Sequence, residues 1–340
     1  MKAGFFAAAA AAMTLVAAGG AQAGATLDAI KARGFVQCGV NSGLAGFGSP
    51  DSAGNWTGLD VDFCRAVAVT LFGDPSKVKF TPLSAQQRFP AVQSGEVDLL
   101  SRNTTWTLTR DTSVGLNFAP VTYYDGQGFM VPKKLGVKSA KELNGATVCV
   151  QSGTTTELNL ADYFRANGMS FNPVVIESID EVNAAYFAGR CDVYTTDASG
   201  LAGTRASVAP NPEDHVILPE LISKEPLAPA VRHGDDQWFD IVKWTVYATI
   251  QAEEKGITSK NIDEFLKSKD PDVLRLLGVT PGMGAALGVD EKWAYNVVKK
   301  VGNYGEIFEK NVGKNTPLKL ERGLNALWTQ GGLQYAAPFR

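Results

Sequence analysis

Two distant segments of the chain share one pattern of residue types, and a repeat of this kind restricts the fold strongly. The segments are AVQSGEVDLLSRN at 91–103 and AYFAGRCDVYTTD at 185–197. In each, Ala is followed by Gly four residues later, then by Asp three residues on, and then by an apolar run with a polar end. This spacing predicts a helix that ends at the glycine, a turn and a buried strand.

A second repeat indicates that two lobes share one α/β plan. GFVQCGVNSG at 34–43 and GATVCVQSG at 145–153 both read as a strand that runs into a polar turn. Short buried strands between helices are typical of parallel sheets, whose ligands bind beyond the carboxyl ends of the strands. We therefore predict a cleft between two lobes, lined by the polar strand ends: Asn41 and Ser42, residues 103–105, residues 152–156 and residues 195–197.

Three groups near these strand ends carry or attract charge. Thr154 and Glu157 in SGTTTELNL have the spacing of a capping box, and the helix start that it predicts suits an anion. Arg110 offers a fork of donors suited to a carboxylate, and Asp197 suits an ammonium group. Each group also has an ordinary structural interpretation. The first is a capped helix without a ligand, Arg110 is a solvated surface arginine, and Asp197 is a cap of the helix that follows it. Together they match one small molecule that carries both charges, an α-amino acid.

The N-terminus predicts export. MKAGFFAAAAAAMTLVAAGGAQA has one basic residue, a run of small apolar residues and a closing Ala21-Gln22-Ala23, which predicts a signal peptide over 1–23 that is cleaved near Ala23. A transmembrane helix is the alternative, but Ala and Gly dominate the run and polar sequence follows it. Loss of Lys2 changes the formal charge of −3 to −4, which argues against nucleic acid or an anionic membrane as partner.

The four cysteines predict two disulfides in an oxidising compartment. Cys38 lies in the strand FVQCGV, and Cys64 lies on a helical stripe that would cover that strand, so we pair these two. Cys149 and Cys191 both enter short β-rich runs and fit as neighbours in a second sheet. Four buried free thiols are the alternative.

No metal or cofactor is expected. The cysteines are far apart in sequence, and the two histidines, His215 and His233, lie outside the strand-end groups. A catalytic pair of nucleophile and base is likewise missing from these groups.

Six segments, in the same order, give the chain a family resemblance: WTGLDVDFCRAVA, AVQSGEVDLLSRNTTWTLTR, YYDGQGFMV, VCVQSGTTTE, AGRCDVYTTD and EPLAPAVRHGDDQW. The chain resembles the periplasmic substrate-binding proteins of ATP-binding-cassette (ABC) importers for polar amino acids, most closely the general L-amino-acid branch. The resemblance implies a type II periplasmic binding protein fold, in which each lobe is a mainly parallel sheet flanked by helices. It also implies capture of an L-amino acid by closure of the lobes, and delivery to the membrane subunits of an ABC permease.

From the first lobe, the resemblance implies that Arg110 grips the α-carboxylate of the ligand. Thr105 and the main-chain carbonyl of Asn103 would support the ammonium group. These residues belong to the stretch RNTTWTLTR at 102–110.

From the second lobe, the resemblance implies that Thr154 and Thr155 close on the carboxylate with hydroxyl and backbone N–H groups. Asp197 would take the ammonium group. The binding site would thus be shared by both lobes.

The chain also departs from the pattern of its relatives. Many relatives place an aromatic ring over the ligand where this chain has Leu44, with Phe47 three residues later, and glutamine-specific relatives have lysine at Gln151. Trp106 is a candidate for the pocket wall, with a buried structural role as the alternative. Asn41 is a further candidate. We expect a permissive pocket that takes polar, acidic and amide amino acids.

The implied chain path gives a first lobe of 24–126 plus 228–340 and a second lobe of 127–227. The crossings would be YYDGQGFMV and SKEPLAPAV, whose glycines and prolines suit a hinge. From about residue 275, a C-terminal extension would cover the first lobe with helices. Their apolar positions are Trp293, Val297 and Val301, and then Leu320, Leu324, and Leu327 or Trp328.

Other functions and assemblies stay open at this point. A monomer is expected, and a dimer contact through the extension is the alternative. A sensor domain that acts with a separate receptor, or an exported dehydratase on the same fold, are the competing functions.

Overall fold

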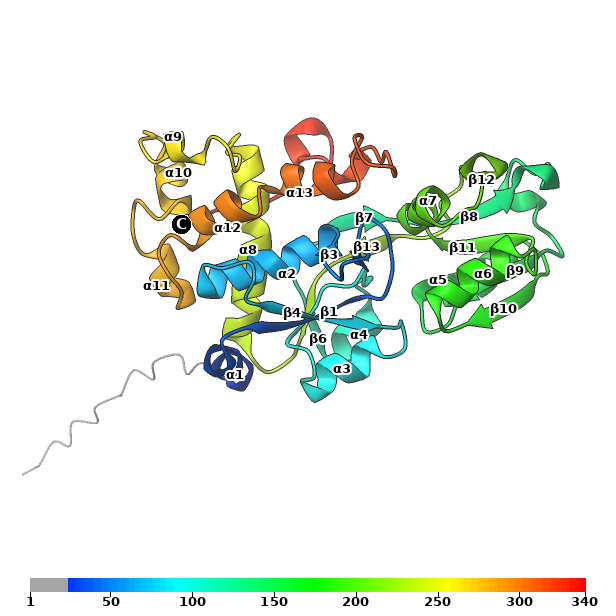
Figure 1. The fold of residues 1–340 in the computed structure, drawn as a ribbon, viewed down its shortest axis with the longest axis horizontal. Helices are drawn as coiled ribbons and strands as arrows, with labels where there is room; N and C mark the ends of the chain where they lie inside the picture. Colours follow the sequence, from blue (N-terminus) through cyan, green and yellow to red (C-terminus); the bar gives the residue numbers. More distant parts are fainter. Residues whose placement is uncertain (1–23) are drawn as a thin grey trace, which may run out of the picture.

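A computed structural model describes residues 24–340, which form two lobes, each with a five-stranded sheet (Figure 1). The predicted signal peptide, 1–23, lies outside the described residues. Within residues 24–340, none of the helices combines the length and apolar character needed to cross a membrane.

The sheet of the first lobe has the strand order β4-β1-β5-β14-β6. β1 is parallel to β4 and β5, whereas β14 is antiparallel to β5 and β6. The strands are β1 Val36–Asn41, β4 Val78–Leu83, β5 Leu99–Leu100, β6 Leu116–Phe118 and β14 Ala230–Arg232, with a separate pair β2 Ser49–Pro50 and β3 Trp56–Thr57. The helices are α1 Ala25–Arg33, α2 Leu59–Phe72, α3 Arg88–Ser94, α4 Leu108–Thr112 and α8 Asp236–Glu254.

The sheet of the second lobe has the order β10-β9-β11-β8-β12, with β9 parallel to β10 and β11 and with β8 antiparallel to β11 and β12. The strands are β8 Gln127–Pro132, β9 Thr147–Gln151, β10 Asn172–Ile176, β11 Val193–Asp197 and β12 His215–Ile217. The helices are α5 Thr155–Ala166, α6 Ile179–Phe187 and α7 Ala198–Ser207, with short 3-10 turns at Lys133–Leu135, Ala140–Glu142 and Pro212–Asp214.

Two short strands connect the lobes. β7 Tyr123–Asp125 and β13 Glu225–Leu227 form an antiparallel pair between the two sheets (Figure 1). β8 and β14 each follow one of these crossings, and each is the antiparallel strand of its sheet. A chain that enters a lobe from the cleft starts where the parallel strands end, so it must run opposite to them. The sheets are therefore mixed, with a parallel majority.

The repeated pattern of the sequence produces the predicted structure in both lobes. Helix α3 ends at Gly95, with φ 79°, and Gly189, with φ 77°, follows the end of α6. The buried strands β5 and β11 come next and lie parallel to β1 and β9. The carboxyl ends of these four strands therefore face the region between the lobes.

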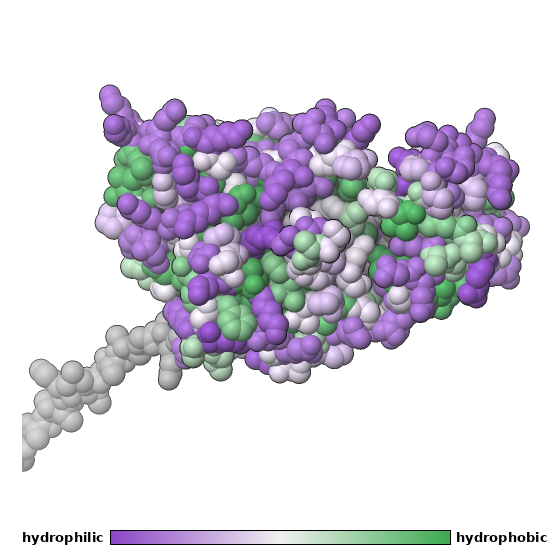
Figure 2. Space-filling model, viewed as in Figure 1, coloured by the Kyte–Doolittle hydropathy of each residue, from purple (hydrophilic) through white to green (hydrophobic). Residues whose placement is uncertain are grey.

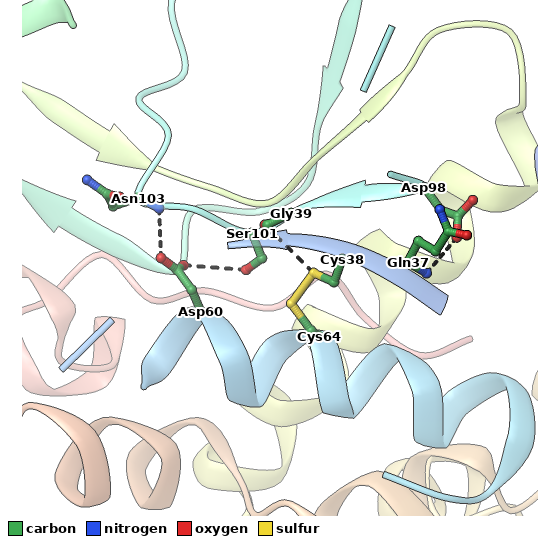
Figure 3. Close-up of a disulfide and its surroundings, with 8 residues drawn as sticks. All are labelled: Gln37, Cys38, Gly39, Asp60, Cys64, Asp98, Ser101 and Asn103. Atoms are coloured by element: carbon green, nitrogen blue, oxygen red, sulfur yellow. Dashed lines mark hydrogen bonds between the residues drawn. A yellow bond between two sulfur atoms is a disulfide. The ribbon is translucent and has the colours of Figure 1, made fainter. Parts of the chain in front are cut away.

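Both predicted disulfides are present. Cys38 on β1 is bonded to Cys64 on α2 (Figure 3), and Cys149 on β9 is bonded to Cys191, just before β11. All four side chains are buried in the lobe cores. Each disulfide thus ties a strand of the parallel part of a sheet to a neighbouring element.

The C-terminal extension packs on the first lobe, but only part of it is helical. Helices α9 Ile262–Phe265 and α10 Pro271–Leu276 lead into it, and its own helices are α11 Met283–Leu287, α12 Trp293–Lys300 and α13 Tyr304–Asn311. Trp293 and Val297 of α12 are buried in a cluster with residues of α2 and α8, as the helical spacing predicted.

The second helix predicted in the extension, around Leu320, Leu324 and Leu327, is wrong. Only 3-10 turns occur there, at Gly323–Asn325 and Trp328–Gln330, and Leu324 is 55% exposed. Lys319 has a φ of 51° and Gly323 a φ of 48°, which interrupt a helix. Asn325 also bonds both the N–H and the C=O of Tyr124, so tertiary contacts fix an irregular path.

Candidate ligand-binding site

The turn after β5 is held in an unusual conformation beside the end of β1. Asn103 has a φ of 33°, which asparagine tolerates better than most residues. The Asp60 carboxylate accepts its backbone N–H at 2.7 Å, and the Asn103 side chain accepts a hydrogen bond of 2.9 Å from Asn41 (Figure 3 shows the first contact). Burial raises the pKa of Asp60 to about 6. A buried carboxylate therefore shapes one wall of the interlobe region.

Arg110 points its guanidinium into the protein. Helix α4 begins after Thr107, whose side chain accepts the backbone N–H of Arg110. Arg110 is 7% exposed, its guanidinium lies over the Phe89 ring, and Nη1 donates to the carbonyl of Thr105 at 2.9 Å. Burial lowers the pKa of Arg110 to about 10, against the opposing effects of Glu225 and Asp197. Among residues 24–340 the guanidinium makes no hydrogen bond besides the one to Thr105, so its other donors could bind an anion.

Two further buried arginines, Arg88 and Arg102, lie near Arg110, and the sequence reasoning missed both. Arg88 donates to the Gly153 carbonyl at 3.3 Å, and Arg102 donates to the Leu83 carbonyl at 3.0 Å. Arg88 Nε and Arg102 Nη2 are buried without a hydrogen-bond partner among the described residues. Burial, and then the like charges of Arg110 and Arg102, lower the pKa of Arg88 well below its usual value. The first lobe thus offers a buried positive region with spare donors.

Asp197 supplies the opposite charge from the second lobe. It precedes α7 at the N-cap position, but its side chain does not cap that helix, so this alternative is wrong. Burial, followed by the nearby acids Asp125 and Glu225, raises the pKa of Asp197 well above its usual value, whereas Arg88 and Arg110 act in the opposite direction. An ammonium group placed beside Asp197 would relieve this cost of burial.

Helix α5 starts where the sequence predicted it. Thr154 is the N-cap and accepts the Glu157 N–H at 3.1 Å, while Glu157 accepts the Gly153 N–H at 2.9 Å rather than completing a capping box with Thr154. Thr155 is the first helical residue, so the helix start contributes backbone donors and a positive dipole end.

Glu225 is the main site residue that the sequence analysis missed. It lies on the crossing strand β13 and is 1% exposed. Its carboxylate accepts hydrogen bonds from four uncharged side chains: Thr105 at 2.6 Å, Thr155 at 2.8 Å, Asn159 at 2.8 Å and Ser223 at 2.7 Å. A glutamate in SKEPLAPAV carries no local sign of these partners, since three of them lie far away in sequence.

Three of the other candidates, Leu44, Phe47 and Gln151, are buried, whereas Trp106 is partly exposed. Phe47 is fully buried and its ring packs edge-on against Tyr123, within the core of the first lobe. Leu44 is buried in the same cluster. Gln151 donates to the Glu177 carbonyl at 2.8 Å. Trp106 is 42% exposed and donates to Asp111, so its buried structural alternative is wrong.

The two lobes touch each other around this site. Gln86 of the first lobe donates to Ser152 of the second at 2.9 Å, and Ser84 donates to Glu177 at 2.9 Å. In the space-filling view the lobes are in contact below a notch in the upper outline (Figure 2). The structure is therefore a closed arrangement of the lobes. Within residues 24–340, no group of three or more His, Cys, Asp or Glu is arranged to hold a metal ion.

Known proteins resemble this chain along most of its length. Residues 36–264 match the bacterial extracellular solute-binding proteins, family 3. The chain belongs to this family. It is 63% identical, over the full length of both chains, to the general L-amino acid-binding periplasmic protein AapJ of Rhizobium johnstonii. It is 57% identical to the glutamate/glutamine/aspartate/asparagine-binding protein BztA of Rhodobacter capsulatus, covering 94% of this chain and 95% of that one.

A solved structure of the family is also closely similar. The ABC transporter periplasmic binding protein of Brucella ovis, with glutathione bound, superposes with a TM-score of 0.91 at 61% identity. The match covers 93% of this chain and 99% of that chain. The two-lobed fold expected from the resemblance is therefore confirmed.

Proposed function

We propose that this protein captures L-amino acids outside the cytoplasm and delivers them to an ABC permease by closure of its two lobes. The single observation that carries the proposal is the pair of buried opposite charges at the site, Arg110 and Asp197. Neither charge has an ion-pair partner of its own in the described chain. A ligand with a carboxylate and an ammonium group would satisfy both charges.

The roles of the individual residues follow from this pairing. Arg110 would bind the α-carboxylate together with backbone N–H groups at the start of α5. Asp197, Thr105 and the Asn103 carbonyl would bind the ammonium group, and Thr154 and Thr155 would join the site on closure. Charged hydrogen bonds contribute roughly 1.5 to 3 kcal/mol each, so a handful of them supports binding at micromolar or lower concentration.

The side-chain end of the pocket would favour acidic and amide ligands. The spare donors of Arg88 and Arg102 are buried beside Arg110, and an uncompensated buried guanidinium gains most from an oxygen acceptor. BztA is named for glutamate, glutamine, aspartate and asparagine, which all carry such oxygens. Glutathione, bound in the Brucella relative, presents a glutamyl head with the same zwitterion.

The crossing strands β7 and β13 would form the hinge, with lobe boundaries near 126/127 and 227/228. We further propose that the chain is periplasmic after cleavage near Ala23, acts as a monomer and performs no catalysis. The proteins that it resembles at 56% identity or more are named as binding proteins.

A calorimetric screen of the chain from Gly24 onward tests this function. The panel contains the twenty L-amino acids, D-glutamate, glutathione and glutarate, which keeps two carboxylates but lacks the ammonium group. We expect binding of several polar L-amino acids and none of glutarate. Equal binding of glutarate and L-glutamate, or no binding of any amino acid, would refute the proposal.

A further inference from the structure

The buried carboxylate of Glu225 controls which hydrogen-bonding groups the site can offer. Thr105 of the first lobe and Thr155 of the second both donate to the same oxygen, Oε2, at 2.6 and 2.8 Å. The other oxygen, Oε1, accepts from Asn159 and Ser223. Four neutral donors therefore occupy the lone pairs of the carboxylate, which leaves none for a ligand cation.

The bonds to Glu225 determine whether the two threonine hydroxyls can donate a hydrogen bond to a ligand. A hydroxyl has one proton to donate and two lone pairs that accept. The Glu225 oxygen accepts from both threonines, so each hydroxyl uses its one proton in that bond. The two hydroxyl oxygens lie 3.3 Å apart, within hydrogen-bonding distance of each other. With both protons directed to Glu225, neither hydroxyl donates to the other, and both are left with lone pairs alone.

We propose that Glu225 is a positioning residue that turns Thr105 and Thr155 into a pair of acceptors, which selects for the ammonium group of the ligand. This inference rests on the proposed amino-acid site. It assigns the Thr155 hydroxyl to the ammonium side, and leaves the carboxylate of the ligand to Arg110 and to backbone N–H groups. The hydroxyl of Thr154 is occupied in a similar way, since it donates to the Gln151 carbonyl at 2.7 Å.

The chemical prediction concerns α-hydroxy acids. An α-hydroxyl donates one hydrogen bond where an ammonium group donates three, so an acceptor-only pair discriminates against it. Glu225→Gln replaces one acceptor oxygen with a donor. With its nitrogen toward the threonines, the amide donates to one of them, whose proton then turns toward the ligand and repels an ammonium group. Because the amide oxygen can instead face the threonines, Thr155→Val, which removes one acceptor in either case, is measured alongside.

The test measures Kd for L-glutamate and for (S)-2-hydroxyglutarate, in the wild type and in E225Q, by calorimetry. We expect the ratio of Kd for (S)-2-hydroxyglutarate to Kd for L-glutamate to fall at least tenfold in E225Q. Glu220→Gln is the matched control, because Glu220 also accepts from a serine hydroxyl, of Ser139, and from a backbone N–H, but lies on the second lobe away from these threonines. Its ratio should equal that of the wild type.

The outcomes separate the inference from the function on which it rests. An E225Q protein that loses affinity for both ligands by the same factor overturns the role of Glu225, and so does a Thr155→Val protein that keeps the wild-type ratio. A wild type that binds neither ligand nor any amino acid refutes the proposed function instead. If E225Q does not fold, Thr155→Val removes one acceptor directly and must also lower the ratio; an unchanged ratio in that variant overturns the inference.

Discussion

The hydroxyl oxygens of Thr105 and Thr155 lie 3.3 Å apart although the two residues belong to different lobes. Thr105 follows the end of β5, and Thr155 is the first residue of α5. The contact exists because parallel strands of both lobes end at the same interlobe region. A movement that separates the lobes would break this contact, so the proposed binding groups would be assembled only on closure.

Replacement of Arg110 should weaken all amino-acid ligands alike. Arg110→Ala removes the guanidinium that would hold the α-carboxylate, which every amino acid shares. We expect a loss of about 2 to 4 kcal/mol, or roughly 30-fold to 1000-fold in Kd, by calorimetry. A loss confined to one ligand would contradict the assignment.

Replacement of Arg88 should instead change specificity. Arg88→Gln removes a buried donor, Nε, that has no partner in the described chain, and also the cross-lobe bond to Gly153. The second loss affects every ligand, so the informative quantity is the ratio of Kd for L-alanine to Kd for L-glutamate, which we expect to fall about tenfold. The exposed Arg190 provides the control, as Arg190→Gln should leave the ratio unchanged.

Ligand binding should release a proton and strengthen as the pH rises. Burial and the neighbouring acids raise the pKa of Asp197 in this closed arrangement of the lobes, and a bound ammonium group would lower it. Between these two pKa values, binding must therefore expel a proton, and affinity increases with pH. Calorimetry in buffers of different ionisation enthalpy measures this release. It should vanish in Asp197→Asn, and proton uptake by the wild type would refute the role of Asp197.

Asp60 should make the protein less stable as the pH rises through mildly acidic values. Its pKa is about 6 when folded, against 3.8 for an unperturbed aspartate. The folded state therefore holds more protons than the unfolded state between about pH 4 and 6. As the pH rises through this window, Asp60 therefore lowers the free energy of unfolding by about 3 kcal/mol in total. Urea unfolding at pH 4 and pH 7 measures the change in the free energy of unfolding between the two pH values. This change should be smaller in Asp60→Asn than in the wild type, and equal changes would contradict the prediction.

Each disulfide should contribute measurably to stability. The sequence separations of 26 for Cys38–Cys64 and 42 for Cys149–Cys191 correspond to roughly 3 to 4 kcal/mol in the chain-entropy model. Urea unfolding of the two Cys→Ser double variants should show losses of this size, slightly larger for the second. Addition of a reductant to the wild type should act in the same direction, and identical unfolding curves with and without it would contradict the expectation.

The sequence alone determined the features that depend on local periodicity. The helix ends at Gly95 and near Gly189, the buried strands that follow, the polar strand ends and the start of α5 were all read from spacings of a few residues. The Cys38–Cys64 pair followed because one face of a strand and one stripe of a helix must pack together, and the Cys149–Cys191 pair followed from two β-rich runs that fit as neighbours in one sheet.

Only the tertiary structure decided the rest. Glu225 and Arg88 join the candidate site because each bonds to residues of the opposite lobe or of both lobes, and Arg102 joins it by its burial near Arg110, which no local pattern encodes. The irregular path around Asn325 replaced a predicted helix since bonds to the distant backbone of Tyr124 outweigh the apolar spacing. Hydrophobic periodicity is a property of neighbouring residues, whereas hydrogen-bond satisfaction of buried polar groups depends on what the whole fold brings near them.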